Sequence, residues 1–284
     1  QHVEYSDSST IRENYIKRTW YNGYVYDWDY LINANHSEGS TIVRDTLLTS
    51  NWNHSRWDHQ MTIRCEWSRV DSNYIDVYFR RYGDHYVIHD DRNSDISHNT
   101  ITLSSHTTNS TNNIIRSISE SGHVNSINNN VITYDHQGYD RFQWAIHTSH
   151  YTNVKNNTIN GNEFEGGIFA GGHCAVENNT ITGDYSSNVL YVSGDSSVVK
   201  DNLVTNSGGG YGYYTNYGSG QEIKNNVFYH SGSGPMAYVH NSNASLHHNL
   251  FEWNSGRGIN YTYQSSVQIY NNTLVSNTGD YGIY

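Results

Sequence analysis

The chain has 284 residues, a formal net charge of −11 with histidine neutral, and a mean hydropathy of −0.76. Its polarity comes mostly from uncharged residues, and its 26 tyrosines and 7 tryptophans argue against a disordered chain. Neither a basic run nor an apolar run of about 20 residues occurs, which argues against a nucleic-acid partner and against a membrane-spanning helix.

Residues 1–90 show strand-like segments without a regular repeat. Apolar and polar residues alternate at 61–67 and at 74–79, and this period of two predicts β-strands. We interpret residues 1–90 as an irregular N-terminal segment with degenerate first coils of the regular repeat that occupies residues 91–284.

A short motif repeats through residues 91–284. A polar residue is followed by asparagine, and the residues three before and two after that asparagine are always apolar. The spacings are 31, 27, 22, 23, 24, 23 and 23 residues, and a nearly fixed period in this range is typical of a solenoid. The repeated asparagines are Asn99, Asn130, Asn157, Asn179, Asn202, Asn226, Asn249 and Asn272.

This repeat predicts an all-β fold, a right-handed parallel β-helix with coils of about 23 residues. Neighbouring coils stack about 4.8 Å apart, so the two apolar positions form inward-facing columns. The asparagine lies at a bend, where its amide bonds to the same asparagine one coil away, forming an internal ladder. We also expect this asparagine to adopt the left-handed backbone that a tight bend requires.

Motifs such as "VENNTITG" at 176–183 and "IKNNVFYH" at 223–230 resemble the right-handed parallel β-helix proteins of the pectin-lyase-like superfamily, most closely their cell-surface repeat proteins. The resemblance covers roughly residues 90–284. It implies that any chemistry on polysaccharides would use outward-facing residues on adjacent coils. The paired-aspartate and other short catalytic motifs of the superfamily's enzymes do not occur in the regular repeat.

The first candidate site is the row two residues before each repeated asparagine. Lys155, Glu177 and Lys200 occupy this row on successive coils. A polysaccharide lyase needs a base and a cation that neutralises a uronate carboxylate, and lysine can serve. The alternative interpretation is a solvated ladder of salt bridges, which contributes little energy.

The second candidate site is an insertion at 134–141, in one of the two longer coils. Long loops on a rigid scaffold often carry function, although decoration without catalysis is the simpler interpretation. The candidate acids, bases and sugar contacts are Asp135, His136, Asp140, Arg141 and His147, with Tyr134, Tyr139 and Trp144 as stacking platforms.

A calcium site is the only cofactor site that the sequence suggests. The segment "HDDRNSD" at 89–95 holds Asp90, Asp91 and Asp95, and Asp27 and Asp29 are further carboxylates. Calcium prefers several oxygen ligands, but the segment matches no known calcium loop, so a surface turn is the favoured interpretation. We therefore expect no cofactor and no metal.

Two cysteines and eight glycosylation sequons complete the set of candidate sites. Cys65 and Cys174 are interpreted as buried free thiols, with a disulfide as the alternative. The sequons permit glycosylation of a secreted protein. They begin at Asn35, Asn53, Asn109, Asn156, Asn178, Asn243, Asn260 and Asn271.

Three functions are compatible with these features. The first is an extracellular or cell-surface structural solenoid of a layer, sheath, fibre or adhesin, self-associating through its flanks or through an uncapped end at Tyr284, where the chain continues or docks. The second is a lyase or glycosidase acting on an acidic polysaccharide. The third is a carbohydrate-binding module, which predicts aromatic residues aligned in one column on the outer face.

Overall fold

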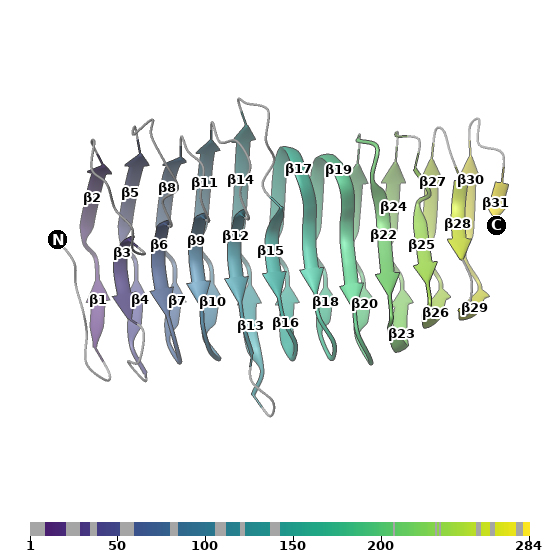
Figure 1. Ribbon diagram of the computed structural model, residues 1–284, viewed down its shortest axis with the longest axis horizontal. Helices are drawn as coiled ribbons and strands as arrows, with labels where there is room; N and C mark the ends of the chain where they lie inside the picture. The colour runs from purple at the N-terminus through teal and green to yellow at the C-terminus, as the bar shows by residue number, and fades with distance from the viewer. Residues whose placement is uncertain are drawn as a thin grey trace.

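The computed structural model shows a single stack of β-coils that runs from the N-terminal coil to the C-terminal coil (Figure 1). It describes residues 9–20, 29–34, 39–51, 60–79, 85–105, 112–119, 123–136, 143–206, 208–230, 232, 234–253, 257–261, 265–276 and 281–284. All regular elements within these ranges are β-strands. Each coil consists of a short strand, a bend, a second strand and a third strand.

The short strands form one parallel sheet of 11 strands, and their order along the sheet numbers the coils from 1 to 11. These strands are β1 (Thr10–Arg12), β4 (Thr41–Val43), β7 (Arg69–Asp71), β10 (Asp95–Ser97), β13 (Asn125–Asn128), β16 (Thr152–Lys155), β18 (Ala175–Glu177), β20 (Val198–Lys200), β23 (Ser219–Lys224), β26 (Asn243–His247) and β29 (Ser266–Tyr270).

The second and third strands of each coil belong to a 20-stranded parallel sheet that wraps the rest of the solenoid. The second strands are β2 (Tyr15–Trp20), β5 (Thr46–Asn51), β8 (Tyr74–Phe79), β11 (Thr100–Ser105), β14 (Val131–His136), β21 (Leu203–Asn206), β24 (Val227–His230), β27 (Leu250–Trp253) and β30 (Thr273–Ser276). The third strands are β3 (Asp29–Ala34), β6 (Gln60–Cys65), β9 (His85–Asp90), β12 (Asn112–Ser117), β15 (Trp144–Thr148), β22 (Tyr211–Asn216), β25 (Ala237–His240), β28 (Arg257–Tyr261) and β31 (Tyr281–Ile283). In coils 6 and 7 one long strand serves both roles, as β17 (Thr158–Ala170) and β19 (Thr180–Ser193).

Apolar side chains stack in columns inside the coils, as predicted. Ile96 on the short strand pairs in register with Val70 and Ile127, and all three are fully buried. A second inward column on the third strands includes Ile88 and Ile115. Each buried aliphatic side chain contributes roughly 1.5–3 kcal/mol relative to exposure, so these columns supply most of the driving force for stacking.

The predicted asparagine ladder is confirmed, and each member joins three coils. Asn179 donates its backbone N–H and its Nδ2–H to Oδ1 of Asn202 in the next coil, both at 2.9 Å. The same Nδ2 donates to the carbonyl of Val154 in the preceding coil at 2.9 Å. The ladder also continues into the first coils, where Asn14, Asp45 and Asn73 occupy the same position.

One detail of the predicted bend is wrong. The left-handed backbone belongs to the residue before each ladder asparagine, for example Asn156 with φ 56° and Asn178 with φ 54°. The backbone N–H of the ladder asparagine donates a hydrogen bond to the amide oxygen of the asparagine in the next coil. This bond fixes the direction of the ladder residue, so the preceding residue takes the left-handed conformation that turns the chain.

Candidate functional site

One outward-facing column on the third strands gathers charged and aromatic side chains in register. We call it the outer column. Parallel pairing aligns its members along β6, β9, β12, β15, β17, β19, β22 and β25, so that one residue projects from each of coils 2–9. Its members are Arg64, His89, Arg116, His147, Phe169, Tyr191, Tyr214 and Tyr238.

The first members of the column share the carboxylate of Asp91. Nε of Arg64 lies 2.6 Å from Oδ2 of Asp91, and Nε2 of His89 lies 3.0 Å from Oδ1. Burial alone would raise the pKa of Asp91, but the contacts with His89 and Arg64 outweigh burial and lower it to about 2. The positive charge of Arg64 is therefore already balanced within the protein.

Arg116 differs from Arg64 because it has no acidic partner among the described residues. Its Nη1 donates to the hydroxyl of Tyr86 at 3.2 Å, and its guanidinium lies 5.4 Å from the centre of the Tyr86 ring. Tyr86 is nearly fully buried, so its ring and hydroxyl contact the guanidinium from the protein side. The arrangement presents a half-buried positive charge, not neutralised by any acid in the described part of the chain, on the outer face of a protein with net charge −11.

The two histidines of the column flank Arg116 and are uncharged at neutral pH. Burial, and to a smaller extent the charge of Arg116, together lower the pKa of His147 to about 4. Burial also lowers the pKa of His89, against the opposing effect of Asp91. A cation beside a neutral imidazole is an arrangement that can hold a carboxylate and accept a proton next to it.

Trp144 and His147, both on β15 in coil 5, contact the aromatic half of the column. The ring centre of Trp144 lies 5.5 Å from that of Phe169 and 6.0 Å from that of Tyr191, in coils 6 and 7. His147 stacks on Phe169 with ring centres 4.5 Å apart and an angle of 11° between the planes. The ring surface therefore begins in coil 5, with His147 as the register neighbour of Arg116.

The tyrosines of coils 7–9 surround an open cavity of ≈ 590 Å³. The ring centres of Tyr191 and Tyr214 are 4.8 Å apart, and those of Tyr214 and Tyr238 are 5.5 Å apart. Tyr211 from β22 adds a fourth ring, and small residues such as Gly209 and Ser187 form the rest of the lining. A cavity with aromatic walls and small polar edges suits a sugar, whose C–H faces pack on rings while its hydroxyls face the edges.

Of the candidate residues predicted in and after the 134–141 insertion, two lie in or beside the outer column. His147 belongs to the outer column, and Trp144 packs against its member Phe169. Tyr134 is buried in the core, and Asp135 is exposed on the neighbouring second strand. Tyr139, Asp140, Arg141 and the side chain of His136 lie outside the described residues.

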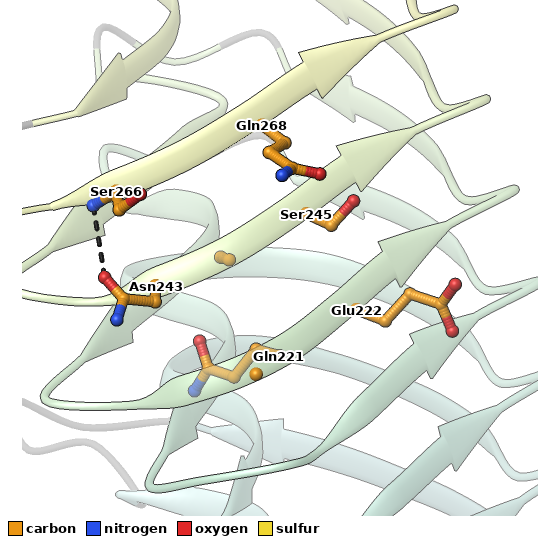
Figure 2. Close-up of a pocket in the computed structure, with 8 residues that line it drawn as sticks. Gln221, Glu222, Asn243, Ser245, Ser266 and Gln268 are labelled. Carbon is orange, nitrogen blue, oxygen red and sulfur yellow. Dashed lines mark hydrogen bonds between the residues drawn. The ribbon is translucent and has the colours of Figure 1, made fainter.

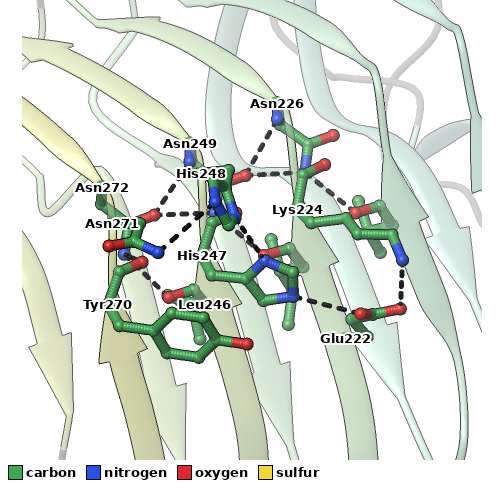
Figure 3. Close-up of polar contacts among 12 residues, drawn as sticks. Glu222, Lys224, Asn226, Leu246, His247, His248, Asn249, Tyr270, Asn271 and Asn272 are labelled. Atoms are coloured by element: carbon green, nitrogen blue, oxygen red, sulfur yellow. Dashed lines mark hydrogen bonds and ion pairs between the residues drawn. The ribbon is translucent and has the colours of Figure 1, made fainter.

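The predicted lysine row forms the ladder of ion pairs that we gave as the alternative interpretation. Glu177 lies between the two lysines, 3.1 Å from Nζ of Lys155 and 3.5 Å from Nζ of Lys200. The row continues through Lys224 and His247, and both contact Glu222, at 2.8 Å and 3.1 Å (Figure 3). Their proposed use as lyase residues would require breaking these pairs.

The short-strand sheet carries a second, shallower cavity of ≈ 390 Å³. Glu222, Ser245 and Gln268 project from three successive coils along one side, and Asn243 and Ser266 form the other (Figure 2). The lining is polar, and it contains neither aromatic rings nor an unpaired charge, since Glu222 is bonded to Lys224 and His247. The cavity therefore offers fewer means of holding a sugar than the outer column.

The aspartates of the proposed calcium site serve different partners. Asp90 is fully buried and accepts hydrogen bonds from Ser117 Oγ at 2.8 Å and Asn125 Nδ2 at 3.0 Å, whereas Asp91 faces the outer column. Asp95 lies on β10, Asp27 lies outside the described residues, and so does the side chain of Asp29. Within the described part of the chain, no three acidic, histidine or cysteine side chains are grouped to hold a metal.

The two cysteines are buried free thiols, and a disulfide between Cys65 and Cys174 within one chain is excluded, whereas a disulfide between chains stays a prediction. Cys65 ends the third strand of coil 2, whereas Cys174 lies between coils 6 and 7, several coil spacings of about 4.8 Å away. A disulfide requires Cα atoms within about 7 Å. Burial also raises the pKa of both thiols, which disfavours the reactive thiolate.

The sequons differ in accessibility, and their glycosylation stays a prediction. Asn156, Asn178, Asn243 and Asn271 are exposed, and three of these occupy the left-handed bend position. Asn260 is 8% exposed, so its amide is poorly placed for modification. Asn35, Asn53 and Asn109 lie outside the described residues.

Sequence reasoning missed most of the outer column, including Arg64, His89 and Arg116. The aromatic members could have been found from the sequence. Phe169 and Tyr191 lie in apolar groups that follow ladder asparagines, "GGIFA" and "NVLYV". Aligning the outward residue of each such group would have revealed the aromatic half. The charged half lies where loop lengths vary, so a sequence alignment of those coils fails.

A comparison with protein-family models agrees with this architecture. A family model described as "right handed beta helix region" matches residues 142–284. The A-module of the mannuronan C-5 epimerase AlgE6 from Azotobacter vinelandii is similar in structure, with a TM-score of 0.49, 11% sequence identity, and coverage of 98% of this chain and 91% of that one. No curated protein matches the chain. Among the described residues there is no helix long and apolar enough to cross a membrane. With half of its length matched by the model, the chain belongs to the right-handed β-helix family.

Proposed function

We propose that this protein binds an acidic polysaccharide along the outer column. The observation that carries the proposal is the guanidinium of Arg116, which has no acidic partner among the described residues and is aligned in register with the rings of Phe169, Tyr191 and Tyr214. A guanidinium pairs with a carboxylate through charge-assisted hydrogen bonds, and aromatic faces accept the apolar faces of sugar rings. An extended polymer lying along the solenoid axis would contact both. Such polymers occur outside cells, so we place the protein in the extracellular space or at the cell surface.

The test is a comparison of two charge-removing substitutions. Arg116→Ala removes the cation of the column for which the described ranges hold no acidic partner, and Lys155→Ala removes a paired cation on the short-strand sheet. We expect Arg116→Ala to raise the Kd for oligouronides by about tenfold or more, a loss of ~1.4 kcal/mol, and Lys155→Ala to leave it unchanged. Equal effects of the two substitutions, or no binding of any oligouronide, would contradict the proposal.

A second candidate function is elimination by a polysaccharide lyase, and the neutral imidazole of His147 favours it. With a uronate carboxylate held by Arg116, His147 would be available to accept the proton next to that carboxylate. As that proton leaves C5, the glycosidic bond from C4 to oxygen breaks, the leaving oxygen takes a proton from water, and the C4=C5 double bond of the product absorbs in the ultraviolet. His147→Gln should then abolish the absorbance while leaving the Kd for oligouronides nearly unchanged, and an unchanged rate would rule out this role.

The hypothesis of a structural solenoid in a surface layer, sheath, fibre or adhesin stays a prediction from the uniform repeat. Electron microscopy of the native protein tests it directly. Filaments or sheets would support self-association, and dispersed single particles at high protein concentration would contradict it.

A further inference from the structure

The outer column is divided into a cationic half and a half without cations. Arg64 and Arg116 lie on β6 and β12, in coils 2 and 4. In contrast, β17, β19, β22 and β25 of coils 6–9 contain neither lysine nor arginine. The charged side chains described on these four strands, Glu165 and Asp184, are acids.

The aromatic half is unfavourable for an anion. The face of an aromatic ring carries the negative side of its quadrupole, which attracts cations and repels carboxylates. Burial and the neighbouring phenols raise the pKa of Tyr214 to about 12, so its hydroxyl stays protonated and can hydrogen-bond a sugar. A uronate placed there would lose hydration of its carboxylate without gaining a cation, whereas a neutral sugar pays no such cost.

The cationic half, in turn, offers an available positive charge for one carboxylate rather than for several. Asp91 already occupies the guanidinium of Arg64 and contacts His89. Within the described residues of this half, the guanidinium of Arg116 is the cation of the column that lacks an acidic partner. A polymer with a carboxylate on every sugar would therefore have most of its charges unmatched.

From this division, and resting on the proposed polysaccharide binding, we propose that the ligand is a mixed polysaccharide in which uronate and neutral sugars occur in one chain. A uronate would lie at Arg116, and neutral sugars would lie on Phe169, Tyr191, Tyr214 and Tyr238. Because the two halves of the column differ, the polysaccharide binds in one direction only. Trp144 then lies beneath the sugar that links the uronate to the neutral sugars.

The test uses three sets of oligosaccharides of equal length, each set covering several backbones. The first set is fully acidic, such as oligogalacturonates, the second is neutral, such as xylo- and cello-oligosaccharides, and the third carries one uronate among neutral sugars, such as glucuronoxylan fragments. Titration calorimetry with the whole chain should show that the best mixed ligand binds about tenfold or more tightly than the best ligand of either other set.

Two substitutions then assign the segments. Arg116→Ala should weaken binding of mixed and acidic ligands and leave neutral ligands unaffected. Tyr214→Ala should weaken mixed and neutral ligands and leave acidic ligands unaffected, and Tyr238→Ala, at an equivalent position, should behave in the same way. Circular dichroism spectra that match the wild type establish that each variant is folded.

The outcomes separate the two proposals. If fully acidic ligands bind as tightly as mixed ones and also depend on Tyr214, the proposal of a mixed ligand is overturned while polysaccharide binding stands. If no acidic or mixed ligand binds, or if Arg116→Ala changes nothing, both proposals are overturned together.

Discussion

The indole of Trp144 lies directly across the backbone of Gly166, its register partner in the next coil. A Cβ at position 166 would overlap the six-membered ring of the indole. The absence of a side chain at Gly166 thus lets Trp144 reach Phe169 and Tyr191 and extend the aromatic half of the outer column into coil 5.

Replacing Gly166 with alanine should displace Trp144 without unfolding the chain. The φ of Gly166 is outside the left-handed region, so alanine fits the backbone and only the indole must move. We expect altered tryptophan fluorescence and a rise of about tenfold in the Kd for the polysaccharide. Gly282→Ala is the matched control, because the nearest atom there is Cδ2 of Leu274 at 3.7 Å.

A double variant tests whether Gly166 acts through Trp144. If it does, Gly166→Ala should have no further effect on affinity in a Trp144→Ala background, since coupled residues are not additive. Additive losses would show that Gly166 acts on the ligand by another route.

Asp45→Asn should stabilise the protein. Asp45 replaces asparagine in the ladder, and its Oδ1 accepts from N and Nδ2 of Asn14 at 2.7 Å and 3.0 Å. Its buried Oδ2 has no hydrogen-bond partner, whereas the equivalent Nδ2 of Asn73 donates to Asn99 and to Ile42. Restoring that donor should raise the free energy of unfolding by about 1–3 kcal/mol, measured by urea denaturation.

Asn73→Asp is the matched control for this change. In the wild type, Nδ2 of Asn73 donates two hydrogen bonds. Asn73→Asp replaces this donor with a carboxylate oxygen, so it should lower the free energy of unfolding by a similar amount. If Asp45→Asn also lowered stability, the ladder at coil 2 would not depend on an amide donor.

The stability of the wild type relative to an Asp90→Asn variant should be greater in mild acid than at neutral pH. Burial raises the pKa of Asp90 to about 6, and hydrogen bonds from Ser94 and Ser117 oppose this effect only partly. The folded state therefore binds the proton more tightly than the unfolded state, whose pKa is near 3.8. The resulting stability is present below pH 3.8 and is lost as the pH rises towards 6.

Urea denaturation between pH 4 and pH 8 measures this effect. The free energy of unfolding of Asp90→Asn minus that of wild type should increase by up to about 3 kcal/mol as the pH rises to 6, and should then stay constant. A difference independent of pH would show that Asp90 keeps an ordinary pKa.

Four side chains on coils 9–11 form a hydrogen-bonded chain that fixes two histidine tautomers (Figure 3). Nε2 of His247 lies 3.1 Å from Oε1 of Glu222, an acceptor, so Nε2 must carry the proton. Nδ1 of neutral His247 then accepts from Nδ1 of His248, 2.8 Å away, and Nε2 of His248 accepts from Asn271.

Nitrogen-15 NMR at a pH where both imidazoles are neutral reads these tautomers. We expect the Nε2–H form for His247 and the Nδ1–H form for His248. Glu222→Gln should relax the preference of His247, since an amide can donate as well as accept. The opposite tautomers in wild type would contradict this chain of hydrogen bonds.

The sequence predicted the fold because the ladder requires the same chemistry in every coil. The signal extended further than the regular repeat, since Asn14, Asp45 and Asn73 are also flanked by apolar residues three before and two after. Their spacings vary because the segments between second and third strands differ in length, and varying spacings conceal a period.

The outer column was harder to predict for a physical reason. Inward positions must be apolar in every coil, so they repeat, whereas outward positions such as Arg116 and Tyr214 face no common packing requirement. The lysine row was found because it lies at a fixed distance from the ladder, within the same short strand. The outer column lies beyond the variable segment, so only the strand register of the folded chain aligns its members.

The ladder also determines how the chain can be lengthened or shortened. Each asparagine bonds to the coils on both sides, so a deletion that includes a ladder asparagine keeps the ladder continuous only if it removes complete coils. Removing the 23 residues from Asn179 to the residue before Asn202 would bring Asn157 and Asn202 into adjacent rungs and would remove Tyr191 alone from the outer column. The length of the aromatic half, and with it the number of sugars that the proposed binding would involve, is therefore adjustable in steps of one coil, without redesign of the core.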